Sequence, residues 1–76
     1  MTSAPIRELV RTLPFVPFDL HLANGKIMHV QHPDFASVQP AGRVLIVWRP
    51  DGEGFEIIDL LLVNNITVER KNQAAV

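Results

Sequence analysis

The chain of 76 residues has no cysteine and no tyrosine, and its aromatic residues are limited to four phenylalanines and one tryptophan. Without cysteine, disulfide bonds and thiolate metal sites are excluded. An excess of charge is also missing, because seven lysines and arginines against eight aspartates and glutamates leave a formal net charge of −1. This balance argues against a strongly electrostatic nucleic-acid binder.

Long apolar runs are missing too. No apolar stretch approaches the roughly 20 residues of a membrane-spanning helix, and no basic N-terminal segment leads into an apolar run. We therefore expect a cytoplasmic protein without membrane contact. A chain of this length buries only about 60% of the surface that its unfolded form exposes, and such small domains often need a further source of stability. Since disulfides are excluded, oligomerisation is the expected source.

The densest apolar material lies between Phe55 and Glu69. Alternation over residues 55–58 and again over residues 66–69 predicts two strands. Between them, Asp59 is placed to cap a single turn, and the two asparagines at 64 and 65 tolerate unusual backbone angles. The apolar residues of this corner cannot all enter one sheet face, so either the corner buries them or a second subunit covers them. They are the predicted self-association residues Leu60, Leu61, Leu62 and Val63.

The N-terminal region predicts a short amphipathic helix over residues 3–13. Apolar residues recur there at helical spacing, Ser3 is placed to cap the first turn, and Pro14 ends the helix. The buried face is expected to consist of Ile6, Leu9, Val10 and Leu13.

Residues 18–30 predict a β-hairpin. A three-residue loop over 23–25, with Gly25 in a left-handed conformation, sets Leu20 opposite Met28 and Asp19 opposite His29. That register gathers the apolar residues on one face: Phe18, Leu20, Leu22, Met28 and Val30.

The remaining pattern completes a mainly β, α+β domain. Residues 36–39 suggest a short extended piece, and the continuous apolar run within 43–49 predicts a central strand covered on both faces. Turn residues at 50–54 then lead into the strand at 55. We expect one domain over residues 1–70, with an N-terminal helix and a strongly bent antiparallel sheet of about five strands that curls into a small, partly open barrel, followed by a flexible tail over 71–76.

Four blocks of the sequence form a recognisable pattern. Their residues are Pro17, Phe18, Leu20, His21, Leu22, Asn24 and Gly25; His32, Pro33 and Phe35; Pro40, Gly42 and Arg43; and Ile57, Ile58, Asp59, Leu61, Leu62 and Val63. Together they resemble a group of short, uncharacterised bacterial proteins. This resemblance spans roughly residues 5–69 and implies no particular activity. The element order separately resembles the Sm-like small β-barrel fold, which would imply rings closed through edge strands and RNA as a partner.

Metal binding is one candidate chemistry. His29 and His32, with Asp34 or His21, supply nitrogen and oxygen donors, although their spacing matches no recognised ligand motif. The alternative is a cross-strand pair of His29 with Asp19 and a turn role for His32. The sequence contains no nucleophile or phosphate-loop motif, so we predict no catalytic residues, no cofactor and no enzymatic activity.

Nucleic-acid binding is the second candidate. Arg7, Arg11 and Arg43 are the predicted contact residues of a basic patch, and the alternative is that they form an ordinary solvated surface. Trp48 has a ring that can stack on a base, although packing within a core strand also explains it.

The sequence therefore predicts a non-enzymatic, homo-oligomeric small β domain that acts as a protein-binding or scaffolding module. The alternatives are an Sm-like ring that binds RNA and a small metal-dependent enzyme.

Overall fold

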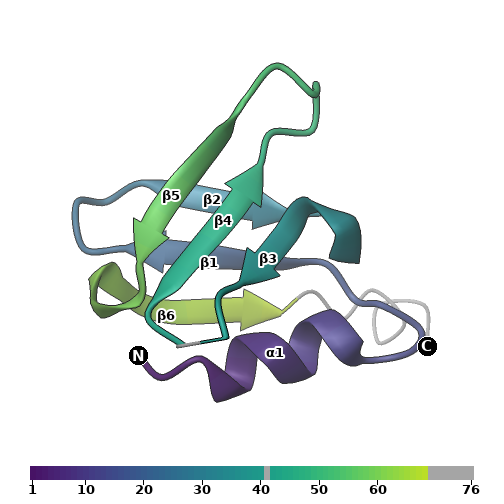
Figure 1. Ribbon diagram of the computed structural model, residues 1–76, viewed down its shortest axis with the longest axis horizontal. Helices are drawn as coiled ribbons and strands as arrows, with labels where there is room; N and C mark the ends of the chain where they lie inside the picture. The colour runs from purple at the N-terminus through teal and green to yellow at the C-terminus, as the bar shows by residue number, and fades with distance from the viewer. Residues whose placement is uncertain (41, 69–76) are drawn as a thin grey trace.

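The computed structural model describes residues 1–40 and 42–68, which form one α-helix and six β-strands (Figure 1). The helix α1 (Ala4–Arg11) is followed by the strands β1 (Phe18–Leu22), β2 (Ile27–Val30), β3 (Ala36–Val38), β4 (Val44–Trp48), β5 (Phe55–Asp59) and β6 (Val63–Val68). One-turn 3-10 helices, η1 (Pro33–Phe35) and η2 (Leu60–Leu62), precede β3 and β6. The tail predicted over residues 71–76 lies outside the described residues.

The strands form two three-stranded antiparallel sheets, β2-β1-β6 and β3-β4-β5. The predicted mainly β, α+β class is confirmed, but the expected single bent sheet of about five strands is wrong. The difference arises at η1 and η2, where the chain passes from one sheet to the other. As a result, β2 does not pair with β3, and β5 does not pair with β6. Over the described residues the two ladders do not close into a barrel.

The core lies between the inner faces of the two sheets, which cross each other in Figure 1. Alternation along β1 and β4 sends every second side chain inward, because successive residues of a strand point to opposite faces. Ile6 of α1 is also fully buried, and the helix runs alongside β6 at one side of the molecule (Figure 1). The most deeply buried side chains are Phe18, Ile6, Leu20, Leu45, Leu60, Val30 and Val47.

The β1–β2 hairpin has the predicted register. Leu20 lies opposite Met28 and Asp19 opposite His29. The backbone N–H of Leu22 donates to the carbonyl of Lys26 over 2.9 Å, and Gly25 takes a φ of 89°. A side chain is strained at such a positive φ, so the three-residue loop depends on glycine at this position.

The helix is shorter than predicted: it spans Ala4–Arg11, whereas the prediction was residues 3–13. A residue before proline avoids the helical conformation, which keeps Leu13 out of the helix and leaves its side chain exposed. Ser3 occupies the N-cap position but makes no side-chain cap bond. Its hydroxyl instead accepts a hydrogen bond from Nε of Arg7 over 3.2 Å.

The leucine corner is the single turn η2, capped as predicted by the Asp59 carboxylate, which accepts a hydrogen bond from the N–H of Leu61 over 2.9 Å. The corner is tighter than expected, since residues 64 and 65 already belong to β6. A turn of this kind directs successive side chains apart. Leu60 and Val63 therefore enter the core, whereas Leu61 and Leu62 stay exposed.

The different environments of two adjacent leucines generate a stability prediction. Leu60 is 1% exposed and Leu61 is 66% exposed. Leu60→Ala should lower the free energy of unfolding by about 2 to 5 kcal/mol, because it leaves a cavity between the sheets. Leu61→Ala, the matched control, should change it by less than about 0.5 kcal/mol. Urea denaturation followed by circular dichroism measures both values, and equal effects would contradict the described corner.

Candidate functional site

The outer face of the β3-β4-β5 sheet carries a cluster of apolar side chains. The antiparallel register sets Ile46 opposite Ile57 and Trp48 opposite Phe55. Directly opposed residues point to the same face of a sheet, and the inner face is occupied by the buried residues of these strands. We call this cluster the apolar face; it consists of Val44, Ile46, Trp48, Phe55 and Ile57.

The apolar face is largely open to solvent. Ile57 is 67% exposed and Phe55 is 54% exposed, and the rings of Phe55 and Trp48 lie 5.9 Å apart between their centroids. The prediction that β4 is covered on both faces is therefore wrong for the single chain, and so is the assignment of Trp48 to the core. Contiguous exposed apolar side chains of this kind mark interaction surfaces.

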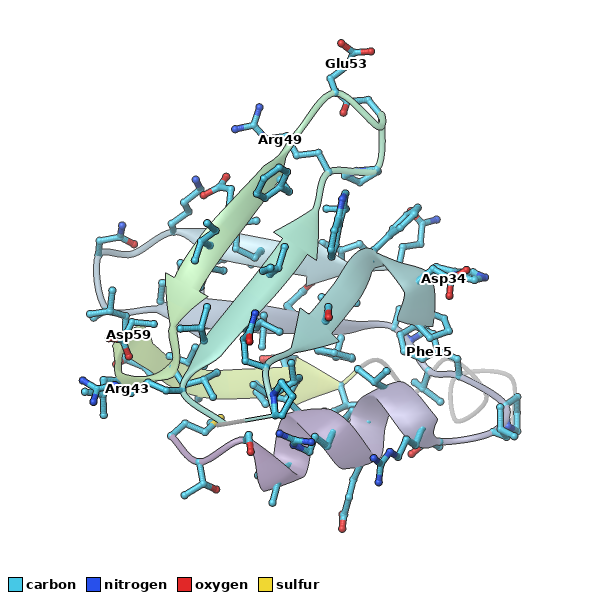
Figure 2. All side chains as sticks on the ribbon, viewed as in Figure 1. Phe15, Asp34, Arg43, Arg49, Glu53 and Asp59 are labelled. Atoms are coloured by element: carbon cyan, nitrogen blue, oxygen red, sulfur yellow. The ribbon has the colours of Figure 1, made fainter. Side chains whose placement is uncertain are left out.

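Charged residues stand at both ends of the β4–β5 hairpin, as Figure 2 shows. Arg43 and Asp59 lie at the end beside η2, with Nη2 of Arg43 3.9 Å from Oδ2 of Asp59. Arg49 and Glu53 lie at the opposite end, in and beside the turn (Figure 2). The end beside η2 thus combines one cation with one anion, and the turn end combines Arg49 with two anions, Asp51 and Glu53. The centre of the apolar face has no charged residue.

Glu56 connects the two sheets from the edge of β5. Nζ of Lys26, beside the β1–β2 turn, lies 2.7 Å from the Glu56 carboxylate, and Nη2 of Arg49 lies 3.6 Å from it. The hydrogen bond from Lys26, together with both positive charges, holds the pKa of Glu56 below its usual value of 4.5. This ionic contact joins the β1–β2 hairpin to the β4–β5 hairpin.

The predicted RNA-contacting arginines have separate local roles. Arg7 donates through Nη2 to the carbonyls of Gln39 and Pro40, over 2.7 and 3.2 Å, and so ties α1 to the segment before β4. Arg43 faces Asp59 at the leucine corner. Arg11 lies in the last turn of α1, where a cation stabilises the negative end of the helix. Sequence reasoning missed the tethering role of Arg7, because its acceptors are backbone carbonyls more than thirty residues away.

The histidines contact different partners. His29 forms the predicted cross-strand hydrogen bond with Asp19, between Nδ1 and Oδ1. His32 accepts a hydrogen bond from the N–H of Asp34 over 3.2 Å and thereby caps η1, and His21 Nε2 lies 2.9 Å from the Thr67 hydroxyl. Within residues 1–40 and 42–68, no three side chains of the metal-binding types gather into a cluster that could hold an ion.

Of the four predicted self-association residues, the structure brings only two to the surface. Leu60 and Val63 are part of the core, because η2 turns them inward, and Leu61 and Leu62 remain candidates for contact with another molecule. Sequence reasoning did not identify the apolar face. Counting outward from the glycine-containing turn at 50–54 would have paired Ile46 with Ile57 and Trp48 with Phe55 and revealed it.

Comparison with known protein families, with curated proteins and with solved structures gave no match. The chain, over the residues that the structure describes, contains no helix with the length and apolar character needed to cross a bilayer.

The Lys26–Glu56 contact predicts a pH-dependent stability. Because the folded state lowers the pKa of Glu56, ionised Glu56 stabilises the fold above pH 4.5, and this contribution is lost as the pH falls through the lowered pKa. Glu56→Gln should therefore be less stable than the wild type near neutral pH, and the difference should shrink under acid conditions.

Urea denaturation at a series of pH values measures this difference. Glu53→Gln, in the exposed turn, is the control and should follow the wild type throughout. If the difference in the free energy of unfolding between the wild type and Glu56→Gln stays the same down to the lowest pH measured, the ionic role of this carboxylate is contradicted.

Proposed function

We propose that this protein is a non-enzymatic, homo-oligomeric binding module whose copies associate through the apolar face. The single observation that carries this proposal is the exposure of Ile57 and Phe55 beside Ile46 and Trp48 on one sheet face. These are the residue types that sheet-to-sheet interfaces bury, and aromatic residues are enriched where proteins meet.

A second copy of the chain is the occupant that the charges favour. Two sheets packed face to face around a two-fold axis present identical patches to each other. When their β4 strands run in opposite directions, the Arg43–Asp59 end of one copy lies over the turn end of the other, where Arg49 and Glu53 stand. Arg43 and Arg49 each keep an acidic neighbour in their own chain, at 3.9 and 3.6 Å, and in this arrangement the acidic residues of the partner add to these contacts. Apolar side chains meet in the centre.

The size of the chain supports the same conclusion. A domain of 76 residues has a small core, and burying one large apolar side chain adds about 1.5 to 3 kcal/mol. A symmetric contact buries each residue of the apolar face twice, once in each copy. Association thus supplies stability that the isolated chain lacks, because in the isolated chain the apolar face is exposed to solvent.

The Sm-like resemblance remains a hypothesis with a different contact. It implies rings joined through strand edges, and its RNA partner would need free cations. Arg7 is already engaged with backbone carbonyls and Arg43 with Asp59, so no observation favours RNA over a second copy. A metal-dependent enzyme likewise stays a hypothesis without a supporting cluster among the described residues.

Replacement of one residue on the apolar face tests the proposal. Ile57→Lys places a charge at the centre of the contact and should raise the dimer dissociation constant by at least about tenfold, since two large apolar side chains lose their burial. Sedimentation velocity over a range of protein concentrations measures the change.

The matched control is Ile27→Lys, because Ile27 is 56% exposed and lies on the other sheet, in β2. It should leave association unchanged. A wild-type protein that stays monomeric at high micromolar concentration would refute the proposal, and so would an Ile57→Lys variant that associates as the wild type does. Circular dichroism of both variants checks that they fold.

A further inference from the structure

A groove of ≈ 530 Å³ separates α1 from β6, on a side of the molecule that the apolar face does not include. The helix runs along the strand in Figure 1, so the groove has one helical wall and one strand wall. The helical wall includes Glu8, Leu9 and Thr12. The strand wall includes Asn64, Ile66 and Val68.

Within residues 1–40 and 42–68, β6 has no strand partner on the side away from β1, because it is the last strand of β2-β1-β6. The direction of its backbone groups follows from its partner β1. The N–H of Leu22 donates to the carbonyl of Lys26 on the β2 side, so the odd-numbered residues of β1 direct their backbone groups toward β6. Thr67 is paired with one of these residues. Since backbone groups alternate along a strand, those of Ile66 and Val68 point away from β1, toward the groove.

The groove combines this edge with an apolar floor and the Glu8 carboxylate. Met1 also lines it, and its ammonium group donates to the carbonyl of Leu60 over 3.1 Å. Leu9, Ile66 and Val68 are half-buried and pack against the core, and Glu8 is exposed at the rim. Among the described residues, no cation forms an ion pair with Glu8. The site therefore offers backbone groups without a partner among the described residues, apolar contact and a negative charge side by side.

We propose that this groove binds an extended segment of a partner protein by adding it as a strand to β6, with an apolar side chain on Leu9 and Val68 and a lysine or arginine beside Glu8. Alternating N–H and C=O groups on a strand edge are matched only by another extended backbone. The span from Asn64 to Val68 is about 13 Å, enough for four or five residues of a strand. The unpaired carboxylate selects a basic segment over an acidic one.

This peptide site is independent of the self-association proposed above, because the apolar face belongs to the other sheet. A dimer formed through the apolar faces would present two such grooves. Two linked grooves raise the apparent affinity for a partner with repeated segments. Such an arrangement gives a scaffolding role a physical basis.

The probe is a fluorescein-labelled eight-residue peptide in which valine alternates with threonine and lysine. We expect saturable binding by fluorescence anisotropy, with amide shifts at Ile66 and Val68 in ¹⁵N spectra of the full chain. The same peptide with every second nitrogen methylated should bind about tenfold or more weakly, since it cannot complete the strand ladder. Equal binding of the methylated peptide would overturn the proposal.

Charge reversal at the rim is the second measurement. Glu8→Lys should weaken binding of the lysine peptide by about fivefold, the range of an exposed ion pair, and should strengthen binding of a peptide with glutamate in place of lysine. Asp34→Lys, a reversal at an exposed position of η1 that lines neither the groove nor the apolar face, is the matched control and should bind both peptides as the wild type does.

Three results would overturn the peptide site. The first is no saturable binding at millimolar peptide, and the second is a set of shifts confined to the apolar face. The third is concentration-dependent protection of the β6 amides without peptide, which would assign the groove to a second copy. The Ile57→Lys variant should keep peptide binding even if it is monomeric, so the two proposals can fail separately.

Discussion

The structure depends on one geometric constraint: a strand directs alternate side chains to opposite faces, while each of these short sheets has only one face toward the core. Polar residues occupy the outer positions of β1, where Asp19 and His21 are paired across strands. In β4 and β5 the outer positions are apolar instead, apart from Asp59 at the end of β5. The two sheets of one chain can bury only one face of each, and the apolar face is the surface left over.

Charge and shape divide the surface of the molecule into parts with different chemistry. The contact of Glu56 with Lys26 joins the two hairpins, and Arg49 approaches the same carboxylate from within the β4–β5 hairpin. Arg7 fixes the helix to the segment before β4. Two further surface features belong to different sheets: the apolar face lies on β4 and β5, and β6 is the outermost strand of the other sheet over the part of the chain that the structure describes.

The sequence predicted the local features well, because near neighbours determine them. The register of the β1–β2 hairpin follows from Gly25 and the alternation around it, and the cap at Asp59 follows from one carboxylate beside one short turn. The division into two sheets was not predictable in this way, since it depends on where η1 and η2 redirect the chain. The exposure of β4 and β5 was predicted wrongly for the same reason. A continuous apolar run is typical of a strand that is covered on both faces. Only the packing of the whole chain determines that Trp48 and Ile57 remain exposed.

Isotope-filtered nuclear Overhauser spectroscopy on a mixture of labelled and unlabelled protein detects direct contact between two copies of the chain. If the copies associate through the apolar face, the spectra should contain intermolecular signals between the methyl groups of Ile46 or Ile57 in one copy and the ring of Trp48 in the other. This is the result expected of the proposed association. Intermolecular signals that come only from the exposed leucines of the corner, or none at all under the same conditions, would contradict it.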